Sequence, residues 1–125
     1  MSVAQIRPHI MLHSGVADTA IALWRRAFPD LTAAPPTGVA GLWTISVGGQ
    51  TFTLFDSPQP HEFAPTPSWS FMVDVDTAAD VDTALGVLSD GGNVIMPADS
   101  YDFAERFAWV EAAHKISWQL RFGPR

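Results

Sequence analysis

The sequence predicts an α+β fold of two βαβββ modules, which form a curved mixed sheet around a cleft and carry their helices outside. Three observations lead to this expectation. Two segments resemble each other at a constant offset, an alternating stretch and a helical pattern precede each of them, and a proline-rich stretch separates the halves.

The internal repeat aligns without a gap. WTISVGGQTFTLFDSP (43–58) and WVEAAHKISWQLRFGP (109–124) lie 66 residues apart, and both begin with Trp and end with Pro. Each also has an aromatic residue followed two positions later by Leu: Phe52 and Leu54, Trp118 and Leu120. Similarity at the scale of a supersecondary unit indicates a duplicated module.

The first half begins with an alternating segment, which predicts a strand over 6–13. A helix follows, because apolar residues recur on one side at helical spacing: Ala17, Ala20, Ile21, Trp24 and Phe28. Further strands are expected over 40–48 and 50–56, with a weaker one near 31–34.

The second half repeats this order. An alternating strand over 69–76 leads into a helix, where Thr77 and Asp80 have the spacing of a capping box and Gly91-Gly92 gives a stop. Its buried stripe consists of Val81, Ala84, Leu85 and Leu88. Strands over 93–97, 106–113 and 115–122 complete the module.

The proposed organisation is one domain, 1–125. Module 1 covers about 1–58, a connection with four prolines covers about 57–68, and module 2 covers about 69–125.

Composition limits the function. The chain has 125 residues, 47% of them hydrophobic, so it can build a core, and without cysteine it has no thiolate chemistry or disulfides. A net charge of −6 argues against a nucleic-acid partner. No signal peptide or membrane span is predicted, so we expect a cytoplasmic protein with no membrane partner.

Strand parity divides the side chains of the first and last strands of each module between two faces. One face is apolar and suits packing under the helices: Ile10, Leu12, Phe52, Leu54, Phe71, Val73, Val75, Trp118, Leu120 and Phe122. The other mixes polar, charged and soft apolar side chains: His9, Met11, His13, Thr51, Thr53, Phe55, Ser70, Met72, Asp74, Ser117, Gln119 and Arg121. This second face either meets water or, in a duplicated curved sheet, lines a ligand cleft.

Three stretches resemble the vicinal oxygen chelate superfamily, and within it the PhnB-like, or demethylubiquinone methyltransferase-like, branch of glyoxalase-fold proteins. They are IRPHIMLHSGVADTAIALWRRAFPD, WSFMVDVDTAADVDTALGVLSDGG and ISWQLRFGP, which together span most of the chain. The resemblance departs from the family pattern where an acidic residue and a glycine are usual, at Ala112 and Lys115. Methyltransferase activity is not expected, because no glycine-rich nucleotide loop follows a strand.

The resemblance also implies four metal positions, which His9, Thr53, Ser70 and Gln119 occupy here. Only His9 is a strong ligand, and Gln119 offers a weaker carbonyl oxygen. His13 and Asp74 lie four residues further along their strands, about 13 Å away, too far to complete one site. The expectation is therefore no metal and no other cofactor, with a divalent ion held by His9 and Gln119 as the alternative.

Several other residues have two interpretations each. Arg121 pairs with Asp74 or binds an anionic group, and Trp43 and Trp109 form an aromatic wall or pack in a core or interface. His61 and Glu62 are expected to be exposed in the connection, and His114 with Lys115 to form a turn. Tyr101, Asp102, Phe103 and Glu105 are assigned to a loop or hairpin.

The leading functional prediction is a homodimeric glyoxalase-like protein that binds a small molecule without a catalytic metal. Its cleft would be lined by His9, Met11, His13, Thr53, Phe55, Ser70, Met72, Gln119 and Arg121. The alternatives are a divalent-metal-dependent lyase, isomerase or dioxygenase using His9 and Gln119, and a non-catalytic interaction module. No catalytic residue is assigned.

Overall fold

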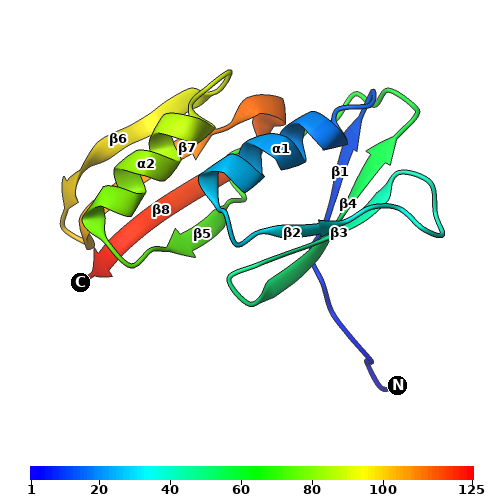
Figure 1. Ribbon diagram of the computed structural model, residues 1–125, viewed down its shortest axis with the longest axis horizontal. Helices are drawn as coiled ribbons and strands as arrows, with labels where there is room; N and C mark the ends of the chain where they lie inside the picture. The colour runs from blue at the N-terminus through cyan, green and yellow to red at the C-terminus, as the bar shows by residue number, and fades with distance from the viewer. The chain divides into compact units, whose positions relative to one another are not determined.

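The computed structural model describes residues 1–125 and divides them into two compact units, Met1–Glu62 and Phe63–Arg125. Each unit contains one helix and one four-stranded mixed sheet (Figure 1). This confirms the predicted α+β class with two βαβββ modules. The division between the units falls inside the proline-rich segment 57–68.

The first unit follows the order strand, helix, strand, strand, strand. Its elements are β1 (His9–His13), α1 (Ala17–Ala27), β2 (Thr32–Ala34), β3 (Leu42–Val47) and β4 (Gln50–Ser57). The sheet order is β1-β4-β3-β2, so the first strand pairs in parallel with the last, while β3 and β4 form an antiparallel hairpin. Gly48 and Gly49 make its two-residue turn with φ of 58° and 79°, a conformation that glycine adopts without a steric penalty.

Helix α1 packs on its own sheet through its apolar stripe. Trp24 is fully buried, and its ring centroid lies 6.3 Å from that of Phe52 on β4. The stripe predicted from helical spacing is confirmed, because Ala17, Ala20, Ile21, Trp24 and Phe28 are all buried.

The N-terminus of α1 is capped from a distant strand. Val16 stands at the N-cap position and has no side chain that could accept a hydrogen bond. The carboxylate of Asp56 at the end of β4 accepts instead from the backbone N–H groups of Gly15, at 3.0 Å, and Ala17, at 2.9 Å. Asp56 therefore satisfies amides that begin the helix and places a negative charge at the positive end of its dipole.

The second unit repeats the order of the first. Its elements are β5 (Phe71–Asp74), α2 (Ala78–Leu88), β6 (Asn93–Tyr101), β7 (Ala104–Glu111), the 3-10 turn η1 (Ala113–Lys115) and β8 (Ser117–Pro124). The sheet order is β5-β8-β7-β6, again with a parallel pair between the first and last strands. Helix α2 packs on β7 and β8 (Figure 1).

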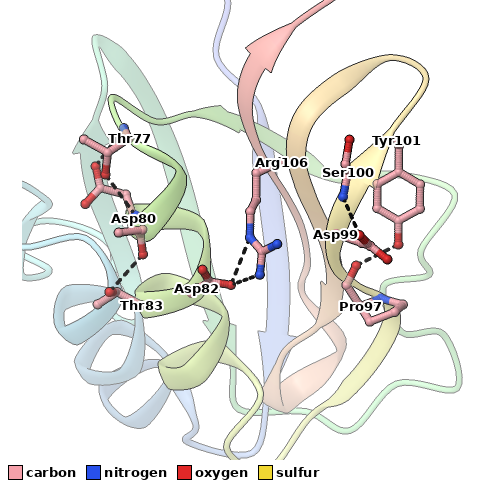
Figure 2. Close-up of polar contacts among 10 residues, drawn as sticks. Thr77, Asp80, Asp82, Thr83, Pro97, Asp99, Ser100, Tyr101 and Arg106 are labelled. Atoms are coloured by element: carbon pink, nitrogen blue, oxygen red, sulfur yellow. Dashed lines mark hydrogen bonds and ion pairs between the residues drawn. The ribbon is translucent and has the colours of Figure 1, made fainter.

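Helix α2 has a local cap, as predicted. Thr77 accepts from the backbone N–H of Asp80 and donates its own N–H to the Asp80 carboxylate, both at 3.1 Å (Figure 2). Two residues after Asp80, Asp82 accepts from Arg106 of β7 at 2.7 Å, which links the exposed side of the helix to the sheet (Figure 2). The predicted stripe is buried at Val81, Ala84 and Leu88, whereas Leu85 is half-buried.

The β7–β8 connection differs from its counterpart in the first unit. Glu111 faces Ser117 across five residues, whereas Val47 faces Gln50 across two. The longer connection includes His114 and Lys115, which both have a positive φ, at 64° and 66°. This confirms that these two residues form the turn, and it places side chains in a backbone region that normally favours glycine.

Most strand boundaries agree with the sequence pattern within about two residues. The strand predicted over 6–13 begins only at His9, and the strand predicted over 69–76 is limited to Phe71–Asp74. The strand predicted over 93–97 continues to Tyr101, so the stretch assigned to a loop or hairpin is the tip of the β6–β7 hairpin. Pro97 and three register irregularities within β6 interrupt the alternation that would have indicated its length.

Replacing Asp56 with Ala is expected to destabilise the protein by about 1–2 kcal/mol, because α1 loses its cap and the favourable charge at its N-terminus. Urea unfolding of the two proteins measures the difference. Asp30→Ala, an exposed carboxylate with no hydrogen bond in the structure, is the matched control and should change stability by less than about 0.5 kcal/mol. Equal effects of the two substitutions would contradict the capping role.

Replacing Gly41 with Ala is expected to cost at least about 1 kcal/mol. Gly41 has a φ of +79°, and an added Cβ would lie 2.7 Å from the Asp56 carbonyl oxygen. Gly38→Ala is the control, since an added Cβ there meets nothing within 4 Å. Thermal unfolding should place Gly41→Ala below the wild type and Gly38→Ala at or above it; the reverse order would refute the close approach.

Candidate functional site

The pairing registers assign the polar side chains of each unit to one face of its sheet, because residues directly opposite each other share a face. We call these surfaces the first and second mixed faces. On the first and last strands of each unit, the first face carries His9, Met11, His13, Thr51, Thr53, Phe55 and Ser57, and the second carries Ser70, Met72, Asp74, Ser117, Gln119 and Arg121.

On the first mixed face, the structure brings His9 and Thr53 together. They face each other in the parallel β1–β4 pair, and His9 Nδ1 lies 2.6 Å from Thr53 Oγ1. Thr53 is buried, whereas His9 is exposed. The Thr53 hydroxyl therefore fixes the orientation of the His9 imidazole, and the second ring nitrogen, Nε2, takes no part in this contact. In the next pair along the strands, Met11 faces Phe55, and both are half-buried.

His13 belongs to a different group at the end of β1. Its Nδ1 lies 2.9 Å from the Ser14 hydroxyl, and its ring meets that of His61 edge to face at 6.0 Å. His61 is half-buried and lies 3.0 Å from Ser57 Oγ, so the expectation that it is exposed in the connection is wrong. No sequence pattern indicated this contact, because no periodic pattern extends beyond Ser57.

On the second mixed face, Ser70, Ser117 and Gln119 form a connected set. Ser70 stands just before β5, its Oγ lies 2.6 Å from Ser117 Oγ, and Gln119 Nε2 donates to it at 3.3 Å. Met72 faces Gln119 directly and is 49% exposed. The structure thus joins the two predicted positions within each unit, His9 with Thr53 and Ser70 with Gln119.

Arg121 pairs with Asp74, its neighbour across β5 and β8, with Nε donating to Oδ1 at 2.7 Å. This hydrogen bond from Arg121, aided by the attraction between the charges and opposed by slight desolvation, lowers the pKa of Asp74 from its ordinary value of 3.8. The same contact raises the pKa of Arg121. Of the two interpretations of Arg121, the structure shows the pair with Asp74.

The two tryptophans at matching repeat positions lie on opposite faces. Trp43 faces Leu54 and so shares the apolar face of its sheet, whereas Trp109 faces Gln119 on the second mixed face. The cause is the longer β7–β8 connection, which displaces β7 by one residue relative to the repeat, and a displacement of one residue exchanges the faces of a strand. Trp109 Nε1 donates to Ser117 Oγ at 2.8 Å, a contact that the sequence did not predict.

The residues at the four metal positions do not fit a divalent ion. None is a carboxylate, His9 lies against a neutral hydroxyl, and Ser70 and Gln119 supply only neutral groups. No three His, Asp or Glu side chains in the structure are close enough together to hold a metal ion.

Comparisons with known proteins agree with this fold. The profile of the 3-demethylubiquinone-9 3-methyltransferase family matches residues 5–121. The PhnB protein of Bacillus cereus superimposes with a TM-score of 0.83 at 27% identity, covering 95% of this chain and 99% of that one. No curated protein matches the sequence.

More distant structures share the fold alone. A glyoxalase/bleomycin resistance protein from Albidiferax ferrireducens has a TM-score of 0.67 at 12% identity and covers 96% of this chain and 100% of its own. A glyoxalase-related enzyme from Fulvimarina pelagi has a TM-score of 0.68 at 15% identity, with 97% and 89% covered. The chain therefore belongs to the 3-demethylubiquinone-9 3-methyltransferase family, the PhnB-like branch of the vicinal oxygen chelate superfamily.

Proposed function

We propose that this protein binds a small, uncharged organic molecule in a cleft lined by a mixed sheet face, without a catalytic metal ion. The observation that carries the proposal is the pairing of polar groups on the mixed faces: His9 with Thr53, and Ser70 with Gln119. Each pair is held by strand pairing and lies beside soft apolar side chains such as Met11 and Met72. A few oriented polar groups on an apolar background are typical of small-molecule sites.

The faces differ from ordinary solvated sheet surfaces. Thr53 and Ser117 are 6% and 2% exposed, although both project from the polar side of their strands. On the second mixed face, which also carries Ser117, Met72 retains 49% exposure. A buried hydroxyl on the same face as an exposed thioether supports a ligand-binding surface, because an ordinary solvated face exposes its polar groups first.

An uncharged ligand is favoured because Arg121, the one cationic side chain assigned to the mixed faces, is already paired. Arg121 donates to Asp74, so an anionic ligand would have to compete with a carboxylate 2.7 Å away.

The metal-dependent lyase, isomerase or dioxygenase needs further ligands beside His9 and Gln119. The interaction module, homodimer and cytoplasmic location stay predictions. In the structure, no helix has the length and apolar character needed to cross a membrane.

A thermal-shift screen of uncharged small molecules tests the binding function. A true ligand at about 100 times its Kd should stabilise the protein by about 2.7 kcal/mol, because it binds only the folded state. Thr53→Val removes a hydroxyl at nearly constant volume, and Met72→Asp places a charge on the second mixed face; one or both should abolish the shift. Thr83→Ala on the exposed side of α2 is the control and should retain it.

Metal analysis tests whether the protein works without a metal ion. Protein incubated with Zn, Ni, Fe or Mn and then dialysed should hold clearly less than one equivalent of each metal. Stoichiometric metal that disappears in His9→Ala would favour the enzyme alternative instead.

The Asp74–Arg121 pair should stabilise the fold only above a certain pH. Because Asp74 has a lowered pKa in the folded state, its contribution is present above the ordinary carboxyl pKa and is lost as the pH falls through the lowered value. The contribution should be small, since both side chains are partly exposed and water screens their attraction. In NMR titrations of the Asp74 carboxyl, Arg121→Gln should raise the pKa, whereas Arg106→Gln should leave it unchanged. An unchanged pKa in Arg121→Gln would disprove the assignment.

A further inference from the structure

One row of side chains crosses the second mixed face from edge to edge. The registers align Met72 of β5, Gln119 of β8, Trp109 of β7 and Met96 of β6. We call these four residues the central row. It contains two thioethers, an indole and one amide, and no charge. Such a row offers a flat, polarisable surface with a single strongly polar group.

The hydrogen bonds beside the central row form a chain. Trp109 Nε1–H donates to Ser117 Oγ at 2.8 Å, Ser117 Oγ lies 2.6 Å from Ser70 Oγ, and Gln119 Nε2–H donates to Ser70 Oγ at 3.3 Å. The chain fixes both the indole and the amide, because each donates a hydrogen to a serine of the same pair.

The direction of the Ser70–Ser117 bond follows from burial. Ser117 is 2% exposed, and Trp109 can only donate to it, so Ser70 is the acceptor available for its hydroxyl hydrogen. Ser70 then accepts from Ser117 and from Gln119, and its own hydrogen has no acceptor in the structure. Ser70 is half-buried, which leaves that O–H available to a ligand.

The amide of Gln119 supplies the complementary group. Its nitrogen donates to Ser70, whereas its carbonyl oxygen makes no hydrogen bond and is not fully buried. A donor on Ser70 therefore stands next to an acceptor on Gln119. Together they match a ligand edge on which a C=O is adjacent to an N–H.

The surrounding charges exclude an anion. Arg121 is paired with Asp74 in the next row, and Glu111 faces Ser117 on the other side of the central row. The charge around the row is therefore negative overall, and a neutral ligand avoids the repulsion that an anion would meet.

We propose that the central row binds a neutral, planar molecule with a lactam edge, an N–H and a C=O on adjacent ring atoms. The inference rests on the proposed binding function and names its ligand class. The ligand C=O accepts from Ser70, the ligand N–H donates to Gln119, and the rings lie against Trp109 and Met72. The span from Met72 to Trp109 covers two strand spacings, about 9–10 Å, which accommodates two fused rings.

Calorimetric titration with three related probes tests this. 2-Quinolone carries the lactam edge, N-methyl-2-quinolone lacks the N–H, and quinoline lacks the C=O and the N–H. We expect 2-quinolone to bind, and N-methyl-2-quinolone to bind about tenfold more weakly, the usual effect of one lost hydrogen bond to a partner left unpaired. Quinoline loses both hydrogen bonds and should bind more weakly still.

Two variants separate the two hydrogen bonds. Gln119→Met keeps the shape of the side chain and should weaken 2-quinolone alone, so that its advantage over N-methyl-2-quinolone disappears. Ser70→Ala should weaken both quinolones about equally and preserve their ratio. Thr83→Ala on α2 is the folding-matched control and should bind all probes as the wild type does.

Two results would overturn the inference. One is the absence of binding heat with 2-quinolone at about millimolar concentration, because a Kd above that range is too weak for a site of this kind. The other is an unchanged preference for 2-quinolone in Gln119→Met. Neither result decides the proposed binding function, because the thermal-shift screen of chemically diverse molecules tests that separately.

Discussion

The parallel pairing between the first and last strand of each unit is the constraint on which the candidate site depends. It sets His9 against Thr53 and Met72 against Gln119, residues that are far apart in the chain. A parallel pair requires a crossover connection, here through a helix and two further strands. The helix covers the apolar face of the sheet, so the same connection that joins the strands leaves the mixed face for function.

The two units cap the free backbone N–H groups at their helix N-termini in different ways. Helix α2 carries its own capping box, whose residues are three positions apart, and the sequence pattern alone predicted it. Helix α1 depends on Asp56, which is 39 residues away from the amide of Ala17 that it binds. A local pattern cannot reveal such a cap. Asp56 also links the end of β4 to the helix, because its backbone N–H donates to Gly41.

The class, the element order and the faces of the first and last strands of each unit could be predicted because each follows from a short period in the sequence. The two middle strands of each unit in chain order could not be assigned to faces in the same way. The repeat implied equivalent roles for Trp43 and Trp109, but pairing register, which depends on the length of a turn, gave them opposite ones. The position of His61 escaped prediction for a related reason, since an aperiodic segment carries no information about what it contacts.

The turn with His114 and Lys115 also determines which face of the sheet the side chains of β7 occupy. Duplication gives two copies of a module the same pattern of inward and outward side chains, and altering a binding wall by substitution would require many simultaneous changes. A change in turn length reverses a whole strand at once. In this chain, the one-residue difference in register sets the indole of one module on the apolar face and that of the other on the mixed face, so that twin modules differ in surface chemistry while keeping their architecture.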